Sequence, residues 1–251
     1  MTARKGTMRM NPKRQQRAGG SGASGTGTAS EPKLEAVIFD LDGVIVNTAE
    51  HHYLAWQRLA DELGVYFDRR INERLKGVDR MTSLEIVLER SEKAYSADEK
   101  QELADRKNRY YIELIDRITP QDLLPGIRQL LADLKARGIR TALASASKNA
   151  PKVIGRLQIG GFFDAIVDAA SVKRGKPDPE IFIRAAEMLG VPEAACIGVE
   201  DAKAGIQAIK AAGMLAVGIG SPAQLHEADL ILESTSQLSL ERLLELFQSA
   251  G

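Results

Sequence analysis

Short apolar runs alternate with longer amphipathic segments along most of the chain from residue 33 onward. The runs have the length of buried strands, whereas the segments between them repeat their apolar residues with a helical period. Strands that alternate with helices predict right-handed crossovers and a parallel sheet covered by helices on both faces. The pattern therefore predicts an α/β fold. Its five expected strands are LEAVIFD (34–40), RTALAS (140–145), FDAIVDA (163–169), AACIGVE (194–200) and LAVGIG (215–220).

The stretch between Asn47 and Pro120 departs from this alternation, because three or four helical patterns follow one another there without a strand run. It predicts a helical insertion after the first strand. We place this helical domain at 48–118 and the α/β core at 33–47 and 119–251. One expected helix face carries His52, Trp56, Leu59 and Leu63, and another carries Leu103, Lys107, Tyr110, Leu114 and Ile118.

His52 and Lys107 are unexpected on these otherwise apolar faces. One interpretation is that His52 is a partly buried helix residue and that Lys107 extends its stem to water. The other is that both faces border a cleft against the sheet, where polar groups can act on a ligand. The helices alone leave both interpretations open, and the chemistry at the strand ends favours the second.

Charge and composition limit the partners. Lys plus Arg and Asp plus Glu number 34 each, so no overall field attracts nucleic acid or an anionic membrane. The single cysteine, Cys196, excludes an intramolecular disulfide and a cysteine metal cage, which is usual in a reducing cytosol. No apolar run approaches the roughly 20 residues that span a bilayer. We expect a cytoplasmic protein that binds neither nucleic acid nor membrane.

The N-terminal segment differs in composition from the rest of the chain. Its first 30 residues contain Arg and Lys but no acid, and they end in a Gly/Ser/Thr tract. Such a composition predicts a disordered basic tail, which we place at 1–32. An organelle transit peptide is the alternative, but the amphipathic apolar spacing of such peptides is missing.

Polar side chains follow the expected strands at the points where they end. Asp40 and Asp42 come at the end of the first run, and Gly43 allows a tight turn there. Ligands of open parallel sheets bind beyond the carboxyl ends of the strands, so the groups at the other strand ends should meet this pair. Those groups are Ser145 to Asn149 in SASKN, Lys176 in KRGKPDP, and Glu200 with Asp201.

This inventory suits Mg²⁺ and a phosphoryl group. Mg²⁺ prefers oxygen ligands, and the candidates are Asp40, Asp201, Glu200 and the backbone carbonyl of Asp42. Asp40 is the candidate nucleophile that forms an aspartyl phosphate, and Asp42 is the candidate acid and base. The charge on the phosphoryl oxygens would be held by Ser145 and Lys176.

Each motif alone has an ordinary explanation, such as an Asx turn for DLDG, and only the set in this order is specific. The set resembles the haloacid dehalogenase superfamily of phosphotransferases, with DLDGV, Ser145, Lys176 and the pair Glu200 and Asp201 as its four motifs. The resemblance implies a Rossmann-like parallel sheet with helices on both faces and an inserted α-helical cap. True dehalogenases lack the second aspartate, so Asp42 points to phosphoryl transfer.

A closer resemblance, to the β-phosphoglucomutase family, rests on DLDGVIVNTAEHHYLAW, LKGVDR, RKN at 106–108, ALASASKN and GVEDAKAGIQAIKAAG. It implies interconversion of β-glucose 1-phosphate and glucose 6-phosphate through bound β-glucose 1,6-bisphosphate. The second phosphate would bind Arg80 with Lys148 and Asn149. His52 and Lys107 would couple cap closure to Asp42. The substrate-binding residues implied are Thr48, His52, Trp56, Lys76, Gly77, Val78, Arg80, Ser83, Lys107, Ala146, Ser147, Lys148 and Asn149.

Two positions depart from the family's pattern. Asn47 stands where the family often has aspartate, and Ala202 stands where many relatives carry serine. Losing that serine hydroxyl removes a possible hydrogen bond to the acidic pair. The alternatives are a Mg²⁺-dependent sugar-phosphate phosphatase of the same superfamily, which shares every core motif, and a sugar-phosphate binding module without turnover. The expected partners are small sugar phosphates, and the expected state is a monomer.

Overall fold

The computed structural model describes residues 33–250, and the tail predicted at 1–32 lies outside the described residues. Within this part of the chain six strands form one sheet in the order β3-β2-β1-β4-β5-β6, and every neighbouring pair is parallel. The predicted α/β fold is confirmed, and only the three-residue β6 was not expected. The strands are β1 (Ala36–Phe39), β2 (Arg140–Leu143), β3 (Ala165–Ile166), β4 (Cys196–Glu200), β5 (Leu215–Ile219) and β6 (Leu230–Leu232).

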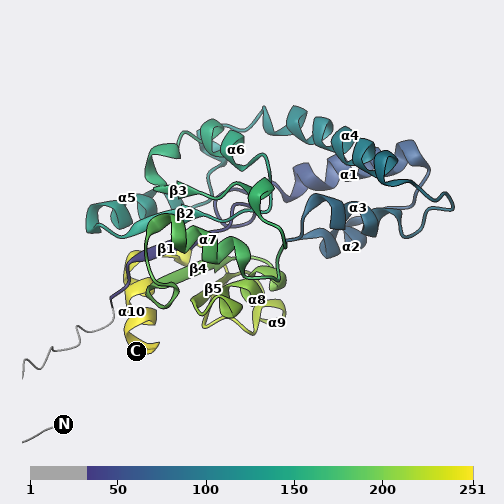
Figure 1. Cartoon of the computed structure of the whole chain (residues 1–251). Coiled ribbons are helices and arrows are strands. Elements are labelled where there is room, and N and C mark those ends of the chain that lie inside the picture. The colour runs from purple at the N-terminus through teal and green to yellow at the C-terminus, as the bar shows by residue number, and fades with distance from the viewer. Residues whose placement is uncertain (1–32, 251) are drawn as a thin grey trace, which may run out of the picture. The chain divides into compact units, whose positions relative to one another are not determined.

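Helices cover both faces of the sheet (Figure 1). Side chains of β1 alternate between the faces, so that Val37 and Phe39 enter one buried cluster and Ala36 and Ile38 enter the other. The first cluster is completed by α5 (Ile127–Arg137), α6 (Ala150–Arg156) and α10 (Leu240–Ala250). The second is completed by α7 (Glu180–Leu189), α8 (Lys203–Ala211) and α9 (Pro222–Leu225).

The chain between β1 and β2 forms a helical cap with a buried cluster of its own (Figure 1). The third cluster includes Trp56, Leu75, Leu84 and Leu103. A reciprocal capping box between Ser96 and Glu99 begins the longest helix. The cap helices are α1 (Ala49–Leu63), α2 (Arg69–Asn72), α3 (Arg80–Leu88) and α4 (Ala97–Ile115).

The buried face of α4 differs from the expected one. It runs through Leu103, Ala104, Lys107, Tyr111 and Ile115. Tyr110 was predicted for this face but lies beside it, because its hydroxyl donates to Glu62 and the Arg58 guanidinium lies over its ring. Leu114 is likewise only partly buried, so the face is turned by about one position.

Two segments connect the cap to the core, and they contact each other. The Leu124 N–H donates to the Ile45 carbonyl at 3.0 Å, and Val46 and Leu123 form an antiparallel bridge. The chain thus leaves and re-enters the core at one place.

Short 3-10 turns complete the described elements, at Glu73–Leu75, Pro120–Asp122, Gly160–Phe162, Ala169–Ser171, Glu193–Ala195 and Thr235–Gln237. None of the helices between residues 33 and 250 has both the length and the apolar character that crossing a bilayer requires.

The strand order fixes where a ligand can bind. Connections run in one direction from β1 through β2 to β3 and in the other from β4 through β5 to β6. The sheet therefore has its topological switch point between β1 and β4, and a crevice opens beyond their carboxyl ends. Asp40 directly follows β1, and Glu200 is the last residue of β4.

Candidate active site

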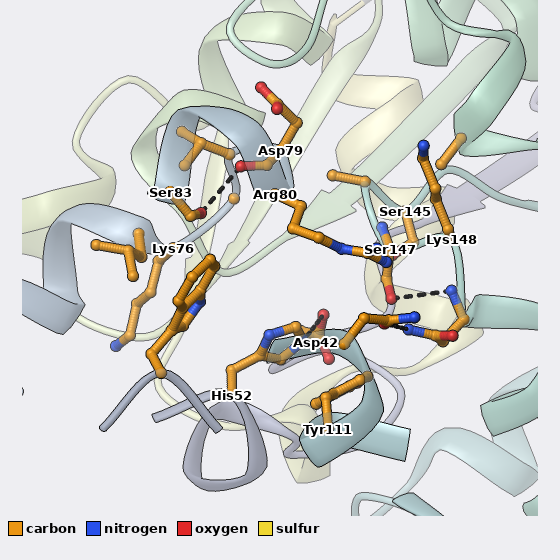
Figure 2. Close-up of a pocket in the computed structure, with 18 of the residues that line it drawn as sticks. Asp42, His52, Lys76, Asp79, Arg80, Ser83, Tyr111, Ser145, Ser147 and Lys148 are labelled. Carbon is orange, nitrogen blue, oxygen red and sulfur yellow. Dashed lines mark hydrogen bonds and ion pairs between the residues drawn. The ribbon is translucent and has the colours of Figure 1, made fainter. Parts of the chain in front are cut away.

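A cavity of about 190 Å³ lies beyond these strand ends, with its walls supplied by both core and cap (Figure 2). Three residues predicted for the site, Thr48, Lys176 and Glu200, are buried outside its lining. The predicted residues that line it are Asp40, Asp42, His52, Trp56, Lys76, Gly77, Val78, Arg80, Ser83, Lys107, Ser145, Ala146, Ser147, Lys148, Asn149 and Asp201.

Lys176 places one positive charge between the ends of β1 and β4. Its Nζ lies 2.6 Å from Oδ1 of Asp40 and 2.8 Å from Oε1 of Glu200, and all three side chains are at most 9% exposed. Burial disfavours the charged amine, but the two carboxylates outweigh burial and raise the pKa of Lys176. Lys176 is therefore a lasting positive charge beside Asp40.

Three carboxylates crowd together next to this lysine. Asp40, Glu200 and Asp201 offer oxygen atoms that all lie within 4.8 Å of one another. Burial, followed by the charges of Glu200 and Asp40, raises the pKa of Asp201 well above its usual range. Burial also raises the pKa of Asp40 to about 6, although Lys176 opposes this rise.

This acidic group fits a hard divalent cation. Asp40 and Glu200 each accept from Lys176 with one oxygen and from the N–H of the residue two positions later with the other, whereas the Asp201 carboxylate accepts no hydrogen bond from the described residues. An all-oxygen donor set of this kind suits Mg²⁺, and a cation would relieve the crowding of negative charge. The side chain of Asp42 is not part of the group. The expectation for Asp42 concerned its backbone carbonyl and stays a prediction.

Two glycines make room for the acidic residues. Gly43 has a φ of 77°, and a Cβ there would collide with the Asp201 carboxylate. Its N–H donates to the Val46 carbonyl at 2.8 Å, which closes the turn after β1. A Cβ at Gly205 on α8 would collide with the Glu200 carboxylate. The backbone thus approaches both acids more closely than other residues would allow.

Asp42 faces the cap. The Thr48 hydroxyl donates to its Oδ1, and the His52 Nε2 lies 3.8 Å from its Oδ2. About a third of the Asp42 side chain is exposed, towards the cavity that it lines. Burial and the neighbouring charge of Asp40 raise the pKa of Asp42 to about 8. Asp42 can therefore carry a proton near neutral pH.

The loop after β2 presents hydroxyl and amide groups to the cavity. The Ser147 N–H donates to Oγ of Ser145, which is 2% exposed. The Asn149 side-chain amide donates to Oδ1 of Asn108 on α4 at 2.8 Å, so it joins core to cap. Lys148 extends from the same loop and is exposed at the cavity (Figure 2).

His52 and Lys107 contact each other in the cap wall. The Lys107 Nζ lies 2.9 Å from His52 Nδ1 and 4.7 Å from the centre of the Trp56 ring. Lys107 is 3% exposed, so it does not extend to bulk water. Burial, aided by the charge of Arg80, lowers its pKa to about 7. Burial and the charge of Lys107 lower the pKa of His52 well below its usual value, which keeps the imidazole neutral.

Arg80 lies at the start of α3, and its guanidinium points into the cavity (Figure 2). It donates no hydrogen bond to a described residue, and Oδ1 of Asp105 lies 3.8 Å from its Nη1. Burial lowers the pKa of Arg80, which nevertheless remains a cation.

The remaining cap residues lie around Gly77. Lys76 pairs with Glu73 at 2.8 Å, and the Ser83 hydroxyl donates to the Asp79 carbonyl at 2.9 Å. Gly77 has a φ of 73°, and a Cβ there would lie 3.0 Å from the Cβ of Ala202 in the core. The cap loop therefore contacts the loop after β4.

Sequence reasoning missed Asn72, Asn108 and Tyr111, which all line the cavity. Asn72 is 9% exposed, and its side chain has no hydrogen bond to a described residue. The Tyr111 hydroxyl is buried and has no hydrogen-bond partner among residues 33–250. Helical periodicity singled out His52 and Lys107, but it could not find Asn72, because α2 has only four residues.

A model of the haloacid dehalogenase-like hydrolase family matches residues 34–213. The chain belongs to this family. It is 54% identical over 214 residues to a β-phosphoglucomutase of Bacillus subtilis. The matched region covers 84% of this chain and 95% of that protein. A crystal structure of β-phosphoglucomutase from Clostridium difficile matches with a TM-score of 0.84 and 48% identity, over 86% of this chain and 98% of that one.

Another relative of this haloacid dehalogenase-like hydrolase is a phosphorylated carbohydrates phosphatase of Thermotoga maritima. It is 32% identical, over 80% of this chain and 91% of that protein. The resemblance inferred from the motifs, to the superfamily and to its β-phosphoglucomutases, is confirmed. The predicted cap is present as the helices between β1 and β2.

Proposed function

We propose that this haloacid dehalogenase-like hydrolase is a β-phosphoglucomutase, which interconverts β-D-glucose 1-phosphate and D-glucose 6-phosphate. The observation that carries the proposal is its extensive identity with the Bacillus subtilis enzyme of that name. The cavity supports it, because groups suited to phosphate lie in both of its walls. Ser145 lines the core wall with Asp40, which Lys176 contacts from behind the lining, and Arg80 belongs to the cap wall.

Asp40, Glu200 and Asp201 would hold Mg²⁺, with the Asp42 carbonyl as a further ligand. When bound, the ion would supply the positive charge that lets an anionic carboxylate approach an anionic phosphate. Lys176 contributes part of the same neutralisation from its fixed place between Asp40 and Glu200. The Ser145 hydroxyl, at the end of β2, would donate to a phosphoryl oxygen.

Asp40 is the proposed nucleophile. A bond forms between its carboxylate oxygen and phosphorus while the bond from phosphorus to the sugar oxygen breaks. Asp42 would give its proton to the departing sugar oxygen and take a proton back when the other hydroxyl attacks. Thr48 occupies Oδ1 of Asp42, which leaves Oδ2 for this proton. The raised pKa of Asp42, about 8, keeps the acid form populated at neutral pH.

Interconversion requires the sugar to turn end for end between two transfers. The intermediate would be β-glucose 1,6-bisphosphate, with one phosphate at Asp40 and the other held by Arg80, Lys148 and Asn149. The Asn149 side-chain amide has two N–H donors and uses one of them to join core to cap through Asn108, so the other would be available to the phosphate.

The cap is proposed to exclude water and to select the sugar. We propose that 48–118 moves as a unit against the core of 33–47 and 119–251. His52 and Lys107 would couple closure to Asp42, since Lys107 contacts His52 and His52 faces Asp42. Sugar hydroxyls would contact Trp56, Ser83 and Asn72. The neighbouring contacts would come from Lys76, Gly77, Val78, Ala146 and Ser147.

The test incubates the full chain with Mg²⁺, β-glucose 1-phosphate and a trace of β-glucose 1,6-bisphosphate. Glucose 6-phosphate is the expected main product, formed only slowly without the bisphosphate and not at all after chelation of the metal. Free phosphate as the main product would instead support the sugar-phosphate phosphatase. No turnover with tight sugar-phosphate binding would support the binding module. Every named group lies in one chain, so we expect activity from a monomer.

A further inference from the structure

Asp105 is the acidic partner of the cavity arginine. It lies on α4, and its Oδ1 is 3.8 Å from Nη1 of Arg80. No other carboxylate of the described residues forms an ion pair with Arg80. The carboxylate of the nearby Asp79 caps the first turn of α3, where it accepts hydrogen bonds from the Met81 and Thr82 N–H groups. Arg80 is thus held by one partner, at a distance longer than a hydrogen bond.

The charges around Arg80 favour this arrangement. Burial and the charge of Arg80 lower the pKa of Lys107, so the positive charge of Arg80 meets a second basic group on the cap side. Asp105 keeps its place because its Oδ2 accepts a hydrogen bond from Gln101 at 3.1 Å. Its side chain is 51% exposed and lies outside the cavity lining, whereas the Arg80 side chain is 20% exposed and belongs to the lining. The carboxylate therefore attracts the guanidinium from the cavity's rim.

A phosphate that binds Arg80 competes with the Asp105 carboxylate for the guanidinium. The guanidinium has its full set of N–H donors available, and a planar fork of donors binds phosphate oxygens in pairs. Asp105 opposes that binding in two ways: it attracts the same guanidinium, and its negative charge repels the phosphate. Both effects weaken binding at the second phosphate site without removing any donor.

We propose that Asp105 is a built-in competitor for Arg80 that weakens binding of the second phosphate, so that the bisphosphate can leave this site and turn. The inference rests on the proposed function, in which Arg80 binds that phosphate. An arginine that held the intermediate too tightly would slow its reorientation, because binding that is equally strong in every bound state does not speed turnover. Asp105 acts through Arg80 and is a positioning residue.

The test measures binding of β-glucose 1,6-bisphosphate by calorimetry, with Mg²⁺ present and Asp40→Asn as the background so that no phosphate is transferred. Asp105→Asn should tighten binding about two- to five-fold, the size expected for a partly exposed ion pair. Glu102→Gln is the charge-matched control, because it lies on the same helix and pairs with Arg106. It should leave binding unchanged.

A double-mutant cycle separates competition from other effects. Asp105→Asn should give no gain when Arg80→Ala is also present. With Asp40 restored, Asp105→Asn should lower KM by a similar factor while kcat does not rise. Weaker or unchanged binding in Asp105→Asn, an equal gain in Glu102→Gln, or a gain that survives Arg80→Ala would overturn the proposal.

Different experimental results would overturn the two proposals. Release of free phosphate by the native enzyme would overturn the mutase, but the titrations need no transfer and would still report on Asp105. Conversely, mutase activity together with unchanged bisphosphate affinity in Asp105→Asn would support the proposed function and overturn the inference about Asp105.

Discussion

The two walls of the cavity differ in how far their polar groups are satisfied. Behind the core wall, the Lys176 Nζ lies 2.6 Å from Asp40 and 2.8 Å from Glu200, and the three side chains are at most 9% exposed. In the cap wall, Arg80 has no hydrogen bond to a described residue, and the Tyr111 hydroxyl is buried without a partner. The core side thus has a linked and buried set of charges, whereas the cap wall retains donors without partners among the described residues.

The difference teaches where preorganisation lies. Groups that stabilise developing charge act best when they are already fixed, which is the condition of the core wall. Groups that recognise a ligand can be unpaired in the empty site, because the ligand supplies their hydrogen-bond partners when it binds. The chemistry should therefore depend on the core wall and the apparent affinity on the cap wall. Substitutions in the two walls should therefore affect different kinetic constants.

Asp40→Asn should abolish phosphoryl transfer, with a loss of at least about 10⁴-fold in kcat, because the amide is a poor nucleophile and a poor metal ligand. Rapid quenching of the native enzyme followed by mass spectrometry should find a phosphate on Asp40 that the variant lacks. Asp133→Asn on α5 is the control and should keep full activity. A variant that still turned over would remove Asp40 from the reaction.

Asp42→Asn should lower kcat by about 10² to 10⁴-fold, the usual contribution of a positioned acid and base. Since the acid form of Asp42 is present below its raised pKa of about 8, the rate of the native enzyme should fall as pH rises through that value. Initial rates from pH 6 to pH 10 check this. The same alkaline limb in Asp42→Asn would assign it to another group.

Gly43→Ala should weaken Mg²⁺ binding about tenfold, because its Cβ would displace the Asp201 carboxylate. Gly138→Ala is a matched control: Gly138 also has a positive φ, 70°, but a Cβ there meets nothing within 4 Å. Both variants should lose about 1 to 3 kcal/mol of unfolding free energy through backbone strain. Calorimetric titration with Mg²⁺ distinguishes them, and equal affinities would contradict the crowding argument.

Asn72→Ala should raise KM for β-glucose 1-phosphate about two- to tenfold with little change in kcat, as expected for one lost hydrogen bond to an uncharged hydroxyl. Gln129→Ala, on the exposed side of α5, is the control and should leave both constants unchanged. A fall in kcat alone would place Asn72 with the chemistry and would break the division between the walls.

The core wall was predictable from the sequence because its residues follow strands. An apolar run ends at Asp40, another ends at Glu200, and parallel topology brings such ends together. The short β6 escaped notice, since three apolar residues carry little periodicity. The side chain of Asp42 could not be placed in advance, because Thr48 draws it towards the cap and away from the acidic group.

The cap wall was harder to predict because helix faces can be assigned only to within about one position. Tyr110 and Tyr111 are adjacent and chemically alike, and only the contact of Tyr110 with Glu62 decides which one faces the cavity. Asn72 lies in a helix of four residues, too short to show a period. The resemblance to a known family identified Arg80, whereas its pairing with Asp105 depends on side-chain placement that no spacing rule supplies.

The contact between the two connecting segments restricts the path that the cap can take. Since Val46 and Leu123 are bridged and Leu124 donates to Ile45, both connections are anchored at neighbouring points. A body attached at two adjacent anchors rotates readily about the line between them and translates poorly. Opening should therefore be a hinge rotation. The displacement should be smallest at Thr48 and largest at the ends of α1 and α4 that lie farthest from the connecting segments.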